Sequence, residues 1–255
     1  MLIKTIQTEQ LVTYVYDSRL AMGEAAGIYA AQVVRELLTR KEYVNVIFAA
    51  APSQNEMLEA FLKADLDFSR IRAFHMDEYA GLDLADQSSF ACYLYEHIFS
   101  KAPFASVNYI PAKMESEAAC EAYSQLLKQY PPDVVCMGIG ENGHIAFNDP
   151  HVADFKDSAT IKKVELDYKC RMQQVHDGCF PTLEHVPKYA LTLTVPTLLS
   201  AQAIVCTVPA STKADAVCAM LEGPYGEKCP ATALRRHVNA RMFLDCDSAS
   251  KVMKE

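Results

Sequence analysis

Short apolar runs alternate along this chain with longer segments in which apolar residues recur every three or four positions. Runs of four to seven apolar residues bounded by polar residues are typical of buried strands, and the longer spacing is typical of helices. We expect strands at 44–50, 71–76, 107–110, 133–137, 161–166, 189–195, 204–208 and 240–245. We expect helical structure at 11–40, from 53 to 62, near 88–99, at 118–129, at 212–221 and in a short segment from 231.

Strands that alternate with helices predict parallel pairing through right-handed crossovers. The expected fold is therefore α/β, a Rossmann-like open parallel sheet with helices on both faces. No internal repeat, low-complexity segment or linker rich in Gly, Ser or Pro divides the sequence. Residues 1–255 are thus expected to form a single domain.

Charge and cysteine usage narrow the class of protein. The net charge is −8 and the basic residues are scattered, whereas nucleic-acid binding needs clustered Lys and Arg. The nine cysteines are odd in number and form no Cys-x-x-Cys pair. The first residues turn polar at once, unlike a secretory leader, and no apolar run approaches the length of a membrane span. We expect a cytoplasmic protein with reduced thiols and no nucleic-acid or membrane partner.

A glycine-rich turn, residues 138–150, follows one predicted buried strand and holds the most informative candidate residues. In open α/β sheets, ligands bind at the carboxyl ends of the strands. Gly143 permits a positive φ and a close approach of the backbone. Asn142 and Asp149 are each able to fix the tautomer of His144, as a catalytic histidine requires. The alternative for His144 is a structural role in which it bonds a carbonyl at the strand end.

A second predicted strand runs directly into Asp77 and Glu78. Two acids at the end of a buried strand are costly unless they are paired or hydrogen-bonded. Asp77 is the stronger candidate for chemistry, and Glu78 is a candidate supporting residue in the binding site. The alternative for this pair is that one of the acids caps the next helix or turns the chain.

Two further turns are candidates for anion binding. Ser53 and Gln54 open a predicted helix, whose N-terminus suits a phosphate, although capping by Ser53 explains the pattern equally well. This loop contains no glycine, so it is neither a Walker loop nor a dinucleotide loop. Lys213 lies in the first turn of another predicted helix, where a cation opposes the helix dipole unless an anion binds there. Arg171, taken alone, is typical of a solvated surface residue.

Histidines and acids also raise the question of a metal. His144, His151, His75 and Asp77 are ligand types that metals accept. Their spacing matches no compact ligand pattern, and no cluster of cysteines supports one. We expect no metal.

Three segments together carry a family resemblance. Residues 74–82 (FHMDEYAGL) resemble the motif F-N-M-D-E-Y-x-G-L, residues 138–150 resemble G-x-G-x-[DN]-G-H-I-x-F-N-E-P, and residues 186–192 are similar to V-P-x-x-A-L-T. These motifs are those of the glucosamine-6-phosphate deaminase/isomerase family, whose superfamily also contains 6-phosphogluconolactonases. The match extends over nearly the whole chain. The continuation His-Ile-Ala-Phe-Asn favours the deaminase branch.

The resemblance implies a role for each candidate residue. Asp77 matches the base that moves a proton from C2 to C1 of the opened sugar, and His144 matches the residue that assists ring opening. Asn142 and Asp149 match the positions that orient the histidine. The expected substrate contacts are Ser53, Gln54, Glu78, Gly143, Arg171 and Lys213, of which Arg171 and Lys213 match phosphate-binding positions. The family requires no metal and no organic cofactor, and it leads us to expect a homo-oligomer.

The chain departs from the family pattern at several positions. Residues 51–55 (APSQN) replace the usual phosphate loop T-G-G-[ST]-P. Asp149 replaces a glutamate one methylene longer, so we expect it to reach His144 only through water or a shift of the backbone. Asn142 stands where many members have Asp, and Asn cannot stabilise an imidazolium by charge. His75 replaces an Asn and adds a titratable neighbour to Asp77.

The resemblance therefore implies an enzyme that converts glucosamine 6-phosphate, or a close epimer, to a ketose 6-phosphate and ammonia. One alternative is a lactonase or another sugar-phosphate hydrolase on the same fold. A second is a non-catalytic sugar-phosphate sensor. Sensors of this architecture carry a helix-turn-helix for DNA, and this chain has no residues to spare for one.

Overall fold

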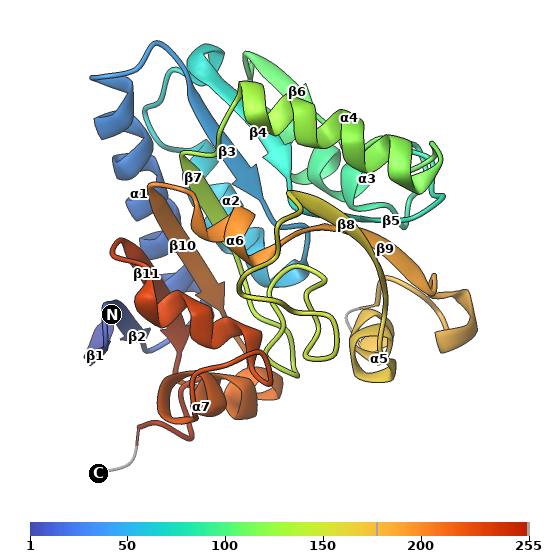
Figure 1. The fold of residues 1–255 in the computed structure, drawn as a ribbon. Helices are drawn as coiled ribbons and strands as arrows, with labels where there is room; N and C mark the ends of the chain where they lie inside the picture. The colour runs from blue at the N-terminus through green and yellow to red at the C-terminus, as the bar shows by residue number, and fades with distance from the viewer. Residues whose placement is uncertain (177, 254–255) are drawn as a thin grey trace.

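A computed structural model gives the structure of residues 1–176 and 178–253. Eight of the described strands form one sheet in the order β1-β2-β11-β10-β7-β3-β4-β6, and three form a smaller sheet in the order β5-β9-β8 (Figure 1). The strands are β1 (Leu2–Thr8), β2 (Leu11–Tyr16), β3 (Val44–Phe48), β4 (Ile71–His75), β5 (Asp77–Tyr79), β6 (Ser106–Asn108), β7 (Val134–Met137), β8 (Ile161–Glu165), β9 (Tyr189–Leu193), β10 (Ala203–Val208) and β11 (Ala240–Asp245).

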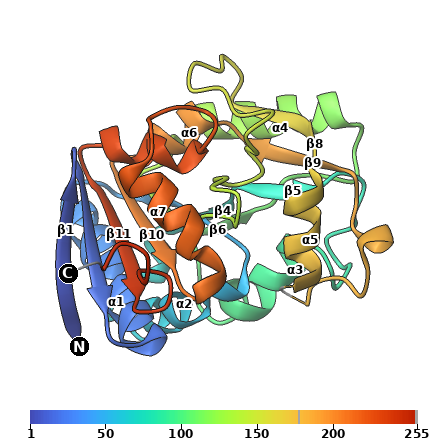
Figure 2. The ribbon, with the colours of Figure 1, turned by 90° about the horizontal axis from the view of Figure 1, so that it is seen from below.

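Helices cover both faces of the large sheet, as the sequence predicts (Figure 2). The helices are α1 (Arg19–Leu38), α2 (Asn55–Leu62), α3 (Phe90–Leu94), α4 (Ser116–Gln129), α5 (Tyr168–His176), α6 (Val195–Leu199) and α7 (Ala214–Glu222). Buried residues of α1, α2 and α3 pack in one apolar cluster, and those of α4, α6 and α7 pack in the other. The Rossmann-like α/β arrangement is therefore confirmed.

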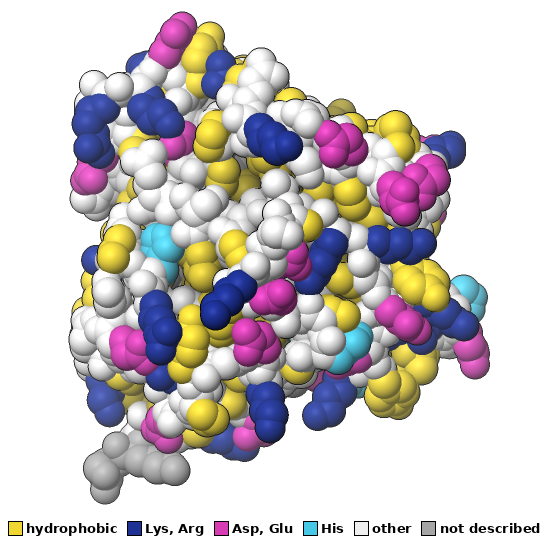
Figure 3. Space-filling view, in the orientation of Figure 1, with side chains coloured by type: hydrophobic (Ala, Val, Ile, Leu, Met, Phe, Trp, Pro, Cys, Tyr) yellow, Lys and Arg dark blue, Asp and Glu magenta, His cyan; other side chains and the backbone are white. Residues whose placement is uncertain are grey.

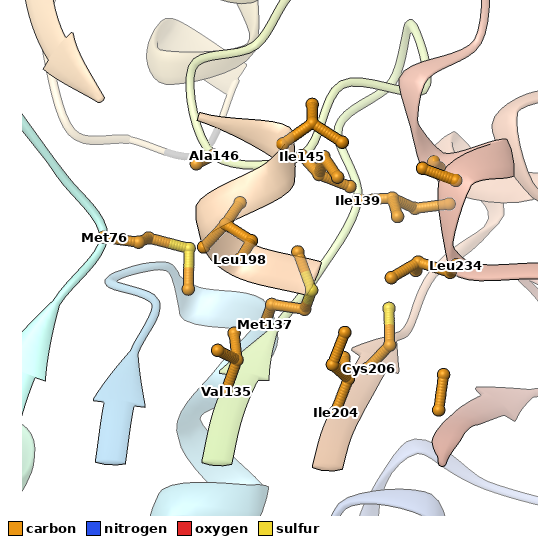
Figure 4. Close-up of a cluster of buried hydrophobic side chains, with 14 of the residues drawn as sticks. Met76, Val135, Met137, Ile139, Ile145, Ala146, Leu198, Ile204, Cys206 and Leu234 are labelled. Carbon is orange, nitrogen blue, oxygen red and sulfur yellow. The ribbon is translucent and has the colours of Figure 1, made fainter. Parts of the chain in front are cut away.

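The central strands divide their side chains between these two clusters with the period of two that a pleated strand imposes. In β7, Val135 and Met137 belong to one cluster, and Val134 and Cys136 belong to the other. Figure 4 shows Met137 and Cys206, from the ends of β7 and β10, in the cluster that also contains Leu198 of α6. Both faces of these strands are thus buried, which explains their uninterrupted apolar sequences.

Two expectations about the elements were wrong. The segment 11–40 is not helical throughout, because β2 precedes α1 and the side chain of Ser18 caps the helix. Leu11, Thr13 and Val15 are fully buried on alternate positions, which is a strand period. Pairing is also not parallel throughout, since β1 pairs antiparallel with β2 and β9 pairs antiparallel with both β5 and β8. The sequence analysis did not anticipate β1, β5, α5 and α6.

The surface gives two observations that bear on partners. On the face seen in Figure 3, basic and acidic side chains are interspersed rather than gathered into a field of one sign. Among the described residues, no helix is both long enough and apolar enough to span a membrane.

Candidate active site

A cleft of about 670 Å³, counting the open space at its mouth, lies where the large sheet's central strands end. Its walls come from the segments that follow β3, β4, β7 and β10, together with α3 and the end of α5. The carboxyl ends of parallel strands meet at one edge of a sheet, so these segments converge although they are distant in sequence. The lining residues with side chains able to do chemistry are Ser53, Gln54, Asp77, His144, Gln173, Gln174, Cys179 and Lys213.

Asp77 begins β5 and lies opposite Thr192 of β9. The small antiparallel sheet therefore fixes the backbone of this residue at the wall of the cleft. Only 7% of Asp77 is exposed. Burial, and then the neighbouring charge of Glu78, raise the pKa of the Asp77 carboxyl well above its usual range. A carboxylate in such a setting is a strong base for its type, which suits it to remove a proton from carbon.

His144 is held by two side chains of its own turn. The ring Nδ1 lies 2.7 Å from Asn142 Oδ1 and 3.1 Å from Asp149 Oδ1. Both of these atoms are acceptors, so Nδ1 carries the proton and the neutral ring keeps Nε2 as its acceptor. This is the fixed tautomer that the sequence suggested. Of the two routes by which Asp149 was expected to reach His144, water is not needed, because the carboxylate contacts the ring directly.

Asp149 is fully buried and yet remains the ionised partner of His144. Burial opposes its ionisation, but the hydrogen bond and charge of His144 and the amide of Asn142 together hold the pKa of Asp149 below its usual range. Asp149 thus supplies the negative charge that Asn142 cannot. A proton that reaches His144 is stabilised by this carboxylate.

Gly140 explains why the turn is rich in glycine. A Cβ built on Gly140 would lie 2.1 Å from Cε1 of His144 and 2.3 Å from each ring nitrogen. Gly143 has a φ of +81°, and a Cβ there would lie 2.7 Å from Sγ of Cys229. Gly140 is therefore required for the histidine to occupy its place, and Gly143 is required for the turn to pass close to Cys229.

His75 does not act as a titratable neighbour of Asp77 in the ordinary pH range. Its Nε2 accepts a hydrogen bond from the backbone N–H of Ile110 at 2.8 Å. Burial lowers the pKa of His75 to about 3, so the ring is neutral near pH 7. The hydroxyl of Tyr123 donates to the backbone carbonyl of His75 at 2.9 Å. His75 thus stabilises the end of β4, and the expectation of a second titrating group beside Asp77 is wrong.

Glu78 is not among the residues that line the cleft. Its carboxylate accepts hydrogen bonds from the backbone N–H groups of Tyr79, Phe90 and Ala91 at 2.8–3.1 Å. Burial raises the pKa of Glu78 to about 7, although these hydrogen bonds act in the opposite direction. Of the two acids, Glu78 therefore takes the capping role that the sequence left open, because it joins β5 to the start of α3.

Replacing Glu78 by Gln should destabilise the fold and leave the chemistry of the folded enzyme nearly unchanged. The amide would turn one N–H₂ group toward backbone donors, which leaves buried N–H groups unsatisfied at about 1–3 kcal/mol. Urea unfolding would measure the loss, and kcat per folded molecule would be the control. A fall in kcat without a fall in stability would instead assign Glu78 to the reaction.

The loop after β3 is built differently from the family's phosphate loop. Residues Pro52–Gln54 form a 3₁₀ turn before α2 begins at Asn55. Gln54 is fully buried, and its Nε2 donates to Ser53 Oγ at 3.0 Å and to the backbone carbonyl of Thr207 at 3.1 Å. This amide therefore ties the loop after β3 to the end of β10. Lys213, only 6% exposed, also lines the cleft.

Arg171 lies outside this cleft. Its Nη2 donates to the backbone carbonyls of Leu183 and Val186 at 2.7 and 2.9 Å, so it holds the segment that leads into β9. Two glutamines two and three residues further along α5 line the cleft instead. Gln173 accepts the N–H of Glu141, and Gln174 accepts the hydroxyl of Tyr79.

Sequence reasoning missed these glutamines because α5 is a polar helix without the apolar spacing of the others. Its buried positions are Cys170, Gln173 and Gln174. Phe90 and Phe147 were also missed, and their rings stack 5.5 Å apart in the wall of the cleft. The one signal available in the sequence was the pair of adjacent glutamines.

Potential metal ligands occur in two groups among the described residues. His144, Asp149 and Cys170 offer donor atoms within 4.8 Å of one another, and so do Asp149, His151 and Asp167. Neither group contains His75 or Asp77. In the first group, the hydrogen bonds among His144, Asn142 and Asp149 explain why His144 and Asp149 lie close together. In the second group, His151 Nε2 is hydrogen-bonded to the carbonyl of Glu165.

Known proteins share both the sequence and the fold. The model of the family described as glucosamine-6-phosphate isomerases/6-phosphogluconolactonase matches residues 17–243. Glucosamine-6-phosphate deaminases from Bacillus cereus (strain B4264) and Bacillus thuringiensis (strain Al Hakam) are each 34% identical over 221 residues, which is 86% of this chain and 82% of theirs.

Solved structures agree with these relatives. A monomeric glucosamine-6-phosphate deaminase superposes with a TM-score of 0.86 at 28% identity, covering 94% of this chain and 99% of that one. A 6-phosphogluconolactonase from Thermotoga maritima superposes with a TM-score of 0.76 at 18% identity, covering 92% and 99%, and shows the same fold. The chain belongs to the enzyme family of glucosamine-6-phosphate isomerases and 6-phosphogluconolactonases.

Proposed function

We propose that this protein is an amino-sugar-phosphate deaminase/isomerase, with glucosamine 6-phosphate or a close epimer as its substrate. The observation that carries the proposal is that a buried carboxylate and a histidine of fixed tautomer, Asp77 and His144, line one cleft. An aldose-to-ketose shift needs a base beside the carbon acid and a second acid–base group at the ring oxygen.

The residues divide the reaction as follows. His144 accepts the proton of the anomeric hydroxyl at Nε2 and delivers it to the ring oxygen, so the C1–O5 bond breaks and the aldehyde forms. Asp77 removes the proton from C2 and returns it to C1. O1 gains a proton as the C2 ammonium loses one, so the aldehyde becomes an alcohol and an iminium is left at C2. Water adds to that iminium and ammonia leaves. No redox change occurs beyond the internal transfer from C2 to C1.

The positions of two other elements support this division. Asn142 and Asp149 both act on Nδ1, so they leave Nε2 for the substrate. Lys213 gives the lining of the cleft a cation that attracts an anionic group. The glucosamine-6-phosphate deaminases of Bacillus cereus and Bacillus thuringiensis bear the activity in their names, at 34% identity to this chain.

Ammonia release from a panel of sugars tests the proposal. The panel contains the 6-phosphates of glucosamine, galactosamine and mannosamine, with unphosphorylated glucosamine as a control. We expect release from one phosphorylated epimer and a much lower rate with the control. Hydrolysis of a sugar-phosphate lactone without ammonia release would favour the lactonase alternative, and binding without any turnover would favour the sensor.

A further inference from the structure

Asn142 is the link between His144 and two carboxylates. Its Oδ1 accepts from the ring Nδ1 of His144 at 2.7 Å and from the backbone N–H of the same residue at 3.0 Å. Its Nδ2 donates to Asp149 Oδ1 at 2.9 Å and to Asp167 Oδ2 at 3.2 Å. Both hydrogens of the amide therefore end on carboxylates, and all of its oxygen's hydrogen bonds come from the histidine.

This arrangement gives the amide one orientation. If it were rotated by 180°, its carbonyl oxygen would face two carboxylates and its N–H₂ group would face the backbone N–H of His144, so these three contacts would become repulsive. Asp149 accepts one of the two amide hydrogens and Asp167 accepts the other. None of the family motifs contains Asp167.

Asp167 is itself rigidly held at the start of α5. Its Oδ1 accepts from the backbone N–H of Cys170 at 2.6 Å, which is the geometry of a helix N-cap. Its own backbone N–H donates to Asp149 Oδ2 at 3.3 Å. One carboxyl oxygen therefore caps the helix while the other faces Asn142. A Ser or Thr at this position is able to cap α5 but is too short to reach Asn142 as well.

We propose that Asp167 is a positioning residue for His144, acting through Asn142. It completes the hydrogen bonding of the amide, so the Asn142 carbonyl holds Nδ1–H and Nε2 stays available to the substrate. It also places behind Asn142 the negative charge that an Asp at position 142 would carry. The expected effect on kcat rests on the proposed function, whereas the expected effect on the tautomer of His144 does not.

Four proteins test the inference: wild type, Asp167→Ser, Asn142→Asp and the double variant. Asp167→Ser keeps a capping hydroxyl and removes the acceptor, so kcat should fall about tenfold with little change in KM, as coupled neighbours commonly show. Asn142→Asp alone sets a third carboxylate beside Asp149 and Asp167, and a similar fall is expected. The double variant moves the charge from 167 to 142 and should recover to within about threefold of wild type.

The state of the His144 ring gives a readout that needs no substrate. In ¹⁵N spectra, wild type should show the Nδ1–H tautomer alone, and Asp167→Ser should show a mixture of the two tautomers. The charged and titratable groups around this ring are Asp149 and Cys170, with Asp167 behind Asn142 and with Asp77 and Lys213 in the same cleft. Only the group at 167 differs between the two proteins.

Asp67→Ser is the matched control, because Asp67 caps a 3₁₀ turn before β4 and does not line the cleft. Two results would overturn the inference. One is a double variant whose kcat loss equals the product of the single losses. The other is Asp167→Ser that melts earlier while its tautomer and pH profile match wild type, which would make Asp167 a helix cap only. If wild type releases no ammonia but Asp167→Ser still shows the predicted change of tautomer, only the proposed function is refuted.

Discussion

Replacing Asp77 by Asn is expected to abolish most of the activity and, at the same time, to make the protein more stable near neutral pH. The kinetic loss follows from removal of the base, which contributes about 10²- to 10⁴-fold to such reactions. The gain in stability follows from the burial of the carboxylate at 7% exposure. An amide of the same shape carries no charge into the wall of the cleft.

The pH dependence of this effect has a definite sign. The pKa of Asp77 is raised in the folded protein, so the folded state holds a proton that the unfolded chain releases near its ordinary pKa of about 4. Folding stability is therefore lost as pH rises from there through the raised pKa. The melting temperature of Asp77→Asn should exceed that of wild type by an amount that grows with pH, and wild-type kcat/KM should rise over the same range.

Thermal melts at several pH values and ammonia release by the same samples measure both parts. Asp77→Glu is a useful companion, since it keeps the charge and displaces it by one methylene. An Asp77→Asn protein with wild-type kcat would remove Asp77 from the mechanism. An inactive but less stable Asn variant would show that the carboxylate has a stabilising partner in the fold.

Replacing Gly140 by Ala should reduce kcat/KM by about 100-fold or more, although no catalytic group is changed. The added methyl would lie 2.1 Å from Cε1 of His144, so the ring must leave its place over Gly140 and lose its bonds to Asn142 and Asp149. A displacement of about 1 Å is enough for a loss of this size. The ¹⁵N spectrum of His144 should change in the same variant.

Gly81→Ala is the matched control. Gly81 has a φ of +91°, and a Cβ there would meet no atom within 4 Å, so the substitution strains the backbone without displacing a neighbour. It should lower stability and leave kcat per folded molecule near that of wild type. Equal kinetic losses in both variants would mean that the effect of Gly140→Ala is general strain rather than displacement of the histidine.

The candidate catalytic residues at the ends of strands were the part of this molecule that the sequence predicted best. Asp77 and His144 each follow a buried apolar run, and parallel strands bring such ends to one edge of the sheet. β2, by contrast, lies within the stretch 11–40 that was predicted to be helical throughout. Its buried positions alternate as in a strand, and it pairs with β1 next to it in sequence. Its other partner, β11, lies more than 200 residues away, and no local pattern indicates that pairing.

Arg171 shows a second limit. A motif assigns an arginine to phosphate by its place in the sequence, but the direction of its side chain depends on how α5 rotates. That rotation is set by the burial of Cys170, Gln173 and Gln174. These residues do not form the apolar pattern that would identify the buried face of a helix. The direct contact of Asp149 with His144 could not be predicted from sequence either. Asp is one methylene shorter than the family's Glu, and whether it reaches the ring depends on the position of the backbone, which the residue pattern does not give.

The amide of Gln54 has a consequence for how this cleft can change during evolution. Its bond to the carbonyl of Thr207 joins a loop from the first half of the chain to a strand from the last quarter. A Cβ at Gly138 would lie 2.9 Å from the same Nε2, so a third segment is fitted around it. If glycines replaced residues 51–55 and nothing else changed, the carbonyl of Thr207 would lose its hydrogen bond from Gln54 and a void would remain. The three segments are thus expected to vary together among homologues, as one inherited block rather than as separate sites.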